Sequence, residues 1–237
     1  MASIDKLLSD RSFSHHFQPI FNLFTWKKAG YEVLLRTEDP SSPEEVFQEA
    51  RLEGRLYELD TLSIMKAVKY YSYEGYTSTD GLLFFNIYPS TIINNSFYPF
   101  IKKLTKDYPS YQLILELSES ELINDYTDFN KKLEPIRALG IRVAIDCFGK
   151  RYSAMERLVE LNPDFLKLDK FLTSGLDLSK EKQFIVEGIN NYCNEFGAQL
   201  IVKGVEKPNE LAIAKYLGVP MAQGYVLAPP ELIKKEL

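Results

Sequence analysis

The sequence is poor in cysteine and histidine and contains no long apolar run. Two cysteines, Cys147 and Cys193, in 237 residues provide no disulfide framework, and their scarcity is typical of a reducing compartment. The two histidines, His15 and His16, are too few for a zinc site built on imidazole ligands. The longest strongly apolar stretch, residues 81–87, is far too short to cross a bilayer. These absences exclude a membrane-spanning chain and predict a cytoplasmic protein.

Positive charge is also in short supply. The chain has 28 Lys+Arg against 33 Asp+Glu, a net charge of −5, and no tract of five or more basic residues. Binding of a nucleic-acid backbone requires basic side chains that neutralise its phosphates, so we expect neither DNA nor RNA as a partner. The remaining composition, 45% hydrophobic and 26% charged, is that of an ordinary globular protein. Because no Pro-, Gly- or Ser-rich linker interrupts it, we expect a single domain over residues 1–237.

Short apolar runs of strand type alternate with stretches of helical spacing. Eight such runs with intervening helices in a chain of this length predict an α/β fold, a (β/α)₈ barrel, rather than an open doubly wound sheet. The gap between the first two runs is too short for a helical crossover, which predicts that these strands are antiparallel. The predicted strands are 17–21, 31–35, 82–87, 112–117, 141–145, 164–168, 199–202 and 223–227. The predicted helices are 43–52, 61–70, 89–106, 126–139, 153–161, 180–196 and 208–217.

Oxygen-bearing side chains recur at the carboxyl ends of these runs. Asn86, Glu116 and Asp146 are 30 residues apart, about one βα unit, so consecutive strands bring them to one mouth of a barrel, and Glu32 joins them from the second run. Buried carboxylates require a positive charge among them, and hard oxygen ligands favour Mg²⁺, Mn²⁺ or Ca²⁺ over Zn²⁺. The alternative is that the acids are solvated strand ends or are neutralised by basic side chains, namely Arg36, Lys167 or Lys203.

Eight segments resemble, in order, the signature of a known family. Together they are similar to EAL domains, the phosphodiesterases of the bacterial second messenger cyclic di-GMP. The triplet that names the family reads Glu32-Val33-Leu34 here, which keeps the carboxylate. The segments are FQPIF (17–21), YEVLLR (31–36), FNIYPS (85–90), ELSES (116–120), AIDCFG (144–149), LKLD (166–169), KGVE (203–206) and QGYVLAPP (223–230).

This resemblance implies a (β/α)₈ barrel with one antiparallel strand that cuts cyclic di-GMP to linear pGpG with two divalent cations and a water between them. Lys167 would position the water, Glu119 would steady the loop after the fifth strand, and Glu206 and Gln223 would complete the floor. The implied ligands of the first cation are Glu32, Asn86, Glu116 and Asp146. The implied nucleotide contacts are Gln18, Arg36, Asp169 and Gln223.

Two positions depart from the family pattern. Cys147 replaces the second of two adjacent aspartates, and Lys203 replaces the glutamate that serves as the favoured general base. The second-cation site thereby becomes three charge units more positive, so we expect at most one divalent cation, Mg²⁺, Mn²⁺ or Ca²⁺. Lys203 is expected to stand in for the second cation; the alternative is that it points to solvent. Lys150 and Arg151 also change the following loop, where the family has threonine and glycine.

The resulting hypothesis is a catalytically degenerate EAL domain that binds cyclic di-GMP as a receptor. One alternative is a working phosphodiesterase in which Glu206 or a neighbour replaces the missing base. Another is a protein-interaction module that no longer binds nucleotide and uses an exposed tyrosine-rich surface, although such a stretch is more often a helix end packed on the barrel. A homodimer and a protein partner both stay open. The tyrosines of that surface are Tyr70, Tyr71, Tyr73 and Tyr76.

Overall fold

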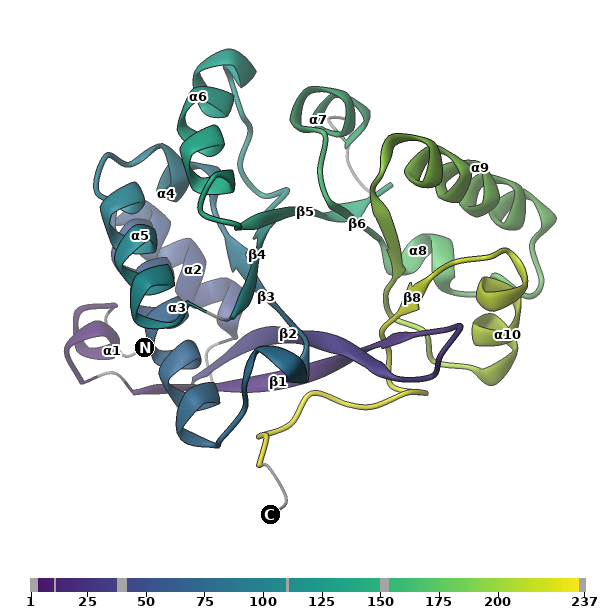
Figure 1. Cartoon of the computed structure of the whole chain (residues 1–237), viewed down its shortest axis with the longest axis horizontal. Coiled ribbons are helices and arrows are strands. Elements are labelled where there is room, and N and C mark those ends of the chain that lie inside the picture. Colours follow the sequence, from purple (N-terminus) through teal and green to yellow (C-terminus); the bar gives the residue numbers. More distant parts are fainter. Residues whose placement is uncertain (1–3, 11, 38–41, 110, 150–153, 235–237) are drawn as a thin grey trace.

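In the computed structural model, eight strands close into one barrel in the order β1 to β8 (Figure 1). The structure describes residues 4–10, 12–37, 42–109, 111–149 and 154–234. The closed barrel with its surrounding helices confirms the predicted α/β fold. The strands are β1 (Phe13–Asn22), β2 (Lys28–Thr37), β3 (Leu82–Ile87), β4 (Gln112–Leu117), β5 (Arg142–Phe148), β6 (Phe165–Leu168), β7 (Gln199–Val202) and β8 (Met221–Ala222).

One strand runs against all the others. β1 pairs antiparallel with both β2 and β8, whereas each remaining neighbouring pair is parallel. The predicted antiparallel start is therefore confirmed, because the short segment between β1 and β2 closes a hairpin and leaves no room for a crossover helix.

Helices cover the outside of the barrel, and local sequence signals set several of their ends. Ser42 and Glu45 form a reciprocal capping box at the start of α2, where Pro43 is the first helical residue. Ser179 caps α9, which ends at Gly197 in the left-handed region at φ 81°. The helices are α1 (Ile4–Asp10), α2 (Pro43–Leu52), α3 (Leu56–Tyr73), α4 (Pro89–Ile93), α5 (Phe97–Asp107), α6 (Tyr126–Arg137), α7 (Ala154–Leu161), α8 (Lys170–Thr173), α9 (Lys180–Phe196) and α10 (Pro208–Tyr216), with a 3₁₀ turn at Ser78–Asp80.

Several predicted elements are longer in the structure, such as the helix expected over 61–70, which is α3, and two further elements are placed differently. The helix expected over 89–106 is two helices, because Asn94 turns the chain and its side-chain oxygen accepts from Ser96 N at 2.9 Å. The last strand, expected over 223–227, is β8 two residues earlier, and Leu227 N instead donates to Gly224 O at 3.0 Å. A Cβ at Gly224 would lie 2.1 Å from Val205 O, so glycine lets the chain pack against Val205 and turn there.

The core has an inner layer within the barrel and an outer layer between the strands and the helices. Alternation along each strand separates the two: in β4, Leu113 and Leu115 pack outward while Ile114 lies in the inner layer. Phe84 and Phe165 meet in the inner layer edge to face, with ring centroids 5.1 Å apart. The inner layer consists of Ile20, Phe84, Ile114, Ala144, Phe165, Ile201 and Met221.

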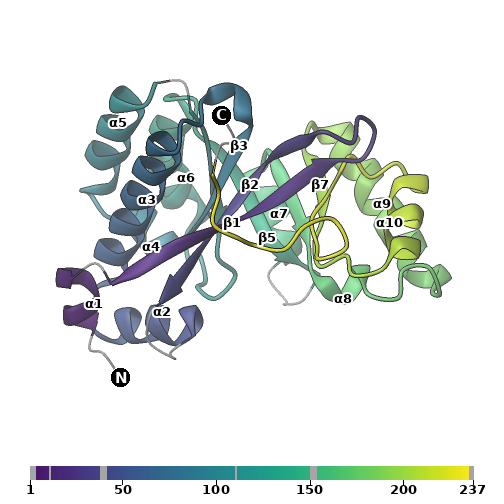
Figure 2. The ribbon, with the colours of Figure 1, turned by 90° about the horizontal axis from the view of Figure 1, so that it is seen from below.

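The segment after β8 crosses back along β1 (Figure 2). Phe17 and Glu231 exchange backbone hydrogen bonds of 2.8 and 3.3 Å, and Tyr70 donates its hydroxyl to Ile233 O at 2.9 Å. Of the four tyrosines, Tyr71 is fully buried, and Tyr70 and Tyr76 pack against the core, so this stretch is a helix end packed on the barrel and not an exposed aromatic patch. Only the side chain of Tyr73 stands out into solvent among these four.

No helix within the described ranges is both long and apolar enough to cross a bilayer.

Candidate functional site

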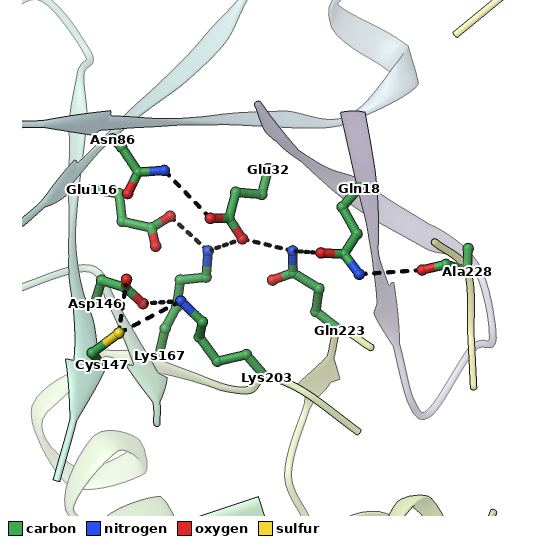
Figure 3. A network of polar contacts seen from close by, with 10 residues as sticks. All are labelled: Gln18, Glu32, Asn86, Glu116, Asp146, Cys147, Lys167, Lys203, Gln223 and Ala228. Atoms are coloured by element: carbon green, nitrogen blue, oxygen red, sulfur yellow. Dashed lines mark hydrogen bonds and ion pairs between the residues drawn. The ribbon is translucent and has the colours of Figure 1, made fainter. Parts of the chain in front are cut away.

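Eight polar side chains form a ring at one end of the barrel, one from each strand or from the residue that follows it (Figure 3). From β3 to β8 each ring residue comes two positions after a residue of the inner layer, as Glu116 follows Ile114 and Lys167 follows Phe165. Because side chains alternate with period two, the same inward face carries both layers. The ring consists of Gln18, Glu32, Asn86, Glu116, Asp146, Lys167, Lys203 and Gln223.

Glu32 is the centre of the hydrogen-bond network. Its Oε2 accepts from Lys167 Nζ at 2.9 Å and from Gln223 Nε2 at 2.6 Å, and its Oε1 accepts from Asn86 Nδ2 at 3.4 Å. Gln223 also donates to Gln18 Oε1 at 3.0 Å. Burial alone would raise the pKa of Glu32, but Lys167 and Lys203 outweigh it and hold the pKa below its usual value.

Glu116 and Lys167 form a fully buried ion pair. Lys167 Nζ donates to Glu116 Oε2 at 2.6 Å, and neither side chain is exposed. Burial, together with the negative charges of Glu32 and Asp146, raises the pKa of Glu116 to about 8 in spite of Lys167. The other oxygen, Glu116 Oε1, is buried and has no hydrogen-bond partner among the described residues.

Lys203 enters the ring and pairs with Asp146, as the sequence predicts, instead of pointing to solvent (Figure 3). Burial alone would raise the pKa of Asp146, but Lys203 and Lys167 hold it far below the usual range. The carboxylates in turn raise the pKa of Lys203 well above its ordinary value against the effect of burial. The ammonium of Lys203 is therefore a fixed positive charge that cannot accept a proton.

Cys147 lies beside this pair in an unusual backbone conformation. Its φ is 53°, in the left-handed region, where aspartate and asparagine are better tolerated than cysteine. The thiol donates to Asp146 Oδ2 at 3.1 Å and is 3.8 Å from Lys203 Nζ. Burial and Asp146 raise the pKa of the thiol, so Cys147 is a protonated thiol and not a thiolate metal ligand.

The ring does not fit a bound metal in this arrangement. With every acid ionised, its three carboxylates, Glu32, Glu116 and Asp146, face two ammonium groups, which leaves a formal net charge of −1; the raised pKa of Glu116 brings this charge closer to zero at neutral pH. Lys167 bonds two of the acids and Lys203 bonds the third. Within the part of the chain that the structure describes, no three acidic, cysteine or histidine side chains come together as metal ligands. The oxygen donors are of the right type, but an ammonium group already occupies one oxygen of each carboxylate.

Two cavities adjoin at the ring and share Glu32 and Lys203 as common walls. The mouth cavity, about 400 Å³, is lined by Asn86, Asp146, Cys147 and Arg36, whose Nη1 donates to Leu35 O at 2.9 Å. The side cavity, about 280 Å³, is lined by Gln18, Asp169, Glu206 and Gln223. Together they bring the predicted nucleotide contacts, Gln18, Arg36, Asp169 and Gln223, to one end of the barrel.

Glu206 does not form the floor of the site. Its side chain is exposed at the rim, paired with Lys170, a residue that no sequence signal singled out. Gln223 does lie on the floor, where it is 2% exposed. Asp169 caps α8 and accepts from Phe171 N at 2.8 Å.

Two other predictions concern the loops around the mouth. Glu119 lies in the loop after β4 and is close enough to Cys147 to contribute to the raised thiol pKa. Its predicted role in the loop after β5 is not tested, because Lys150 and Arg151 lie outside the described residues.

The EAL domain family model matches residues 1–230 of the chain. The chain belongs to the EAL domain family. Among curated proteins, this EAL domain is 27% identical over 220 residues to the blue light- and temperature-regulated antirepressor BluF of Escherichia coli, covering 91% of this chain and 54% of BluF. It is 25% identical over 235 residues to the cyclic di-GMP phosphodiesterase PdeB of Shewanella oneidensis, covering 96% of this chain and 28% of PdeB. The chain thus spans about half or less of these relatives' lengths.

Solved structures share the fold. The EAL domain of Xanthomonas citri FimX, in complex with c-diGMP, matches with a TM-score of 0.85 at 20% identity, over 99% of this chain and 94% of that one. Klebsiella pneumoniae BlrP1, in a manganese and cy-diGMP complex, matches with a TM-score of 0.81 at 25% identity, over 92% of this chain and 56% of that one. A further BlrP1 structure is a calcium complex. The similarity to FimX shows the barrel fold of the EAL domain, and the BlrP1 complexes show that relatives hold divalent cations.

Proposed function

We propose that this EAL domain binds cyclic di-GMP as a receptor and hydrolyses it little or not at all. The observation that carries the proposal is the ion pair between Lys203 and Asp146 in the ring (Figure 3). The identity of the ligand is inferred from the relatives named above. The solved structures of FimX and BlrP1 are complexes with this nucleotide, and PdeB is named as its phosphodiesterase.

The ring lacks a group that could activate water. A general base must be able to accept a proton, and the charged ammonium of Lys203 cannot. Glu32 is bonded to Lys167, Gln223 and Asn86, and Glu206 is held at the rim by Lys170. Glu116 keeps one oxygen without a hydrogen bond, but its side chain is fully buried and paired with Lys167, so no water from solvent reaches it. A missing base alone costs about 10²–10⁴ in rate, and a missing second cation adds to that loss.

Binding needs a positive charge for the phosphates, and the site retains it. Lys203 and Arg36 both line the mouth cavity. An ammonium and a guanidinium are the groups that proteins use for phosphate. The two adjoining cavities on either side of Glu32 and Lys203 suit a ligand with two nucleotide halves. On binding, Lys203 exchanges Asp146 for a phosphate oxygen.

A divalent cation is not needed for this binding. The four predicted ligands, Glu32, Asn86, Glu116 and Asp146, could hold one Mg²⁺, Mn²⁺ or Ca²⁺ only after Lys203 leaves Asp146. A second cation would face the Lys203 ammonium directly. We further infer that residues 1–237 act as one domain and that the protein works in the cytoplasm, where its two unpaired cysteines would stay reduced.

Calorimetry with cyclic di-GMP tests the proposal. We expect a Kd tighter than about 10 μM, or roughly 7 kcal/mol of binding free energy. Lys203→Met should weaken binding at least tenfold, whereas Lys215→Met, which removes a lysine stacked on Trp26 away from the ring, should change it by less than about twofold. Absence of binding up to high micromolar nucleotide would overturn the proposal.

A further inference from the structure

A groove of about 960 Å³ lies next to the nucleotide site, between α4 and the loop that joins β4 to α6. Two apolar side chains on its walls are open to solvent: Leu122 is 66% exposed and Ile93 is 45% exposed. Pro89 and Phe129 also line it. In Figure 1, α4 and α6 lie on the opposite side of the barrel from α9. Exposed apolar side chains gathered around one hollow are typical of a protein-interaction site.

The charge of this groove, the α4 groove, is strongly one-sided. Four acids and one base line it, an excess of three negative charges. The base, Arg51, donates to Ser120 O at 3.0 Å and is therefore held against the loop backbone. Such a surface repels nucleic acids and anionic lipids and attracts lysine and arginine. The four acids are Glu119, Glu121, Asp125 and Asp128.

The wall of the α4 groove is preformed by internal hydrogen bonds. Arg157, which is 1% exposed, donates to Ser118 O at 2.9 Å and also to Glu121 O. The Glu121 carboxylate accepts from Ser90 N at 2.6 Å, which ties the loop to the start of α4. A surface fixed in this way loses little conformational entropy when a partner binds.

We propose that the α4 groove docks a basic segment of a partner protein. An aliphatic side chain of that segment enters between Ile93 and Leu122, and flanking lysines or arginines face Asp125 and Asp128. The partner would then lie against the loop that follows Glu116, because Ser120 lines both the α4 groove and the mouth cavity. The proposal does not rest on nucleotide binding, so it stands or fails separately from the receptor function.

Fluorescence anisotropy with a labelled peptide of Lys-Arg-Leu repeats tests this. We expect a Kd of about 10–100 μM at low salt, weakening as salt screens the acids. Asp128→Lys should weaken binding at least about tenfold. Glu187→Lys on α9 changes the net charge equally but lies outside the groove, and it should change the Kd by less than about twofold. Leu122→Ser should also weaken binding, whereas Leu178→Ser, at a leucine that is 82% exposed and lies outside the groove, should not.

Three outcomes would contradict the proposal of a basic partner in the α4 groove. No peptide binding overturns it directly. Equal weakening by the groove and control charge variants would show that only the net charge is sensed. If sedimentation instead shows self-association that Leu122→Ser abolishes, the occupant is a second copy of this chain and not a basic partner. Circular dichroism of each variant confirms that a loss of binding is not a loss of folding.

Discussion

Restoring the carboxylates that the family has at positions 147 and 203 tests most sharply whether charge alone keeps a second cation out of the ring. With every acid ionised, the variant Cys147→Asp with Lys203→Glu changes the formal net charge of the ring and its neighbour Cys147 from −1 to −4. The first substitution also suits the backbone, because aspartate tolerates the left-handed conformation at position 147 better than cysteine does. The variant should therefore fold.

The electrostatic gain can be worked out from the geometry. An ammonium about 4 Å from a dication repels it by about 8 kcal/mol at an effective dielectric constant of about 20. The Lys203 side chain is 21% exposed, so water screens part of this repulsion, and we take half of the repulsion energy as effective. Removing about 4 kcal/mol of repulsion corresponds to about a thousandfold tighter cation binding.

Calorimetric titration with Mn²⁺ measures this gain directly. The parent should bind more weakly than about 1 mM, and the double variant should bind in the micromolar range. The variant should also convert cyclic di-GMP to pGpG in Mn²⁺. Lys215→Glu, a two-unit charge change outside the ring, should leave Mn²⁺ affinity unchanged. A folded double variant that binds Mn²⁺ no better than the parent would refute the electrostatic account.

Further predictions concern stability and metal dependence. Burial raises the pKa of Asp60 to about 7, so its contribution to stability is complete below about pH 4 and is lost as the pH rises to 7, by about 4 kcal/mol. His15 has the opposite sign, since burial lowers its pKa to about 3 and its contribution is lost as the pH falls from about 6.5 toward 3. Urea unfolding between pH 4 and 7 measures the unfolding free energy of each variant minus that of the parent. This difference should rise with pH for Asp60→Asn and fall with pH for His15→Gln. Slopes of the same sign for the two variants would contradict both assignments. Phe84→Ala, which removes a ring from the inner layer, should cost about 3–5 kcal/mol of unfolding free energy, against less than about 1 kcal/mol for the exposed Phe171→Ala. Replacing Mg²⁺ by EDTA should change the Kd for cyclic di-GMP by less than about tenfold in calorimetry, and a complete loss of binding would show that a cation is required.

The barrel and most of the ring could be predicted from the sequence because both depend on short-range patterns. In the run from Leu113 to Leu117, alternation alone places Glu116 on the inward face above Ile114. The spacing of 30 residues between Asn86, Glu116 and Asp146 then places consecutive strand ends at one mouth.

What the sequence could not supply are contacts between distant segments. The pairing of Glu206 with Lys170 depends on where the loop after β7 meets the start of α8, a short helix of four residues, and neither segment is long enough to show a periodic pattern. The short β8 likewise depends on the close approach of Gly224 to Val205. The α4 groove also escaped prediction, because its walls come from α4 and the loop after β4, which are adjacent only in the folded barrel.

The fate of bound nucleotide tests the central claim most directly. Radiolabelled cyclic di-GMP is incubated with excess protein and Mn²⁺, the protein is denatured, and the nucleotide is separated by chromatography. With Lys203 in place of a base and a second cation, the bound nucleotide should be recovered intact after hours. Rapid conversion to pGpG that Glu32→Ala abolishes would contradict the account.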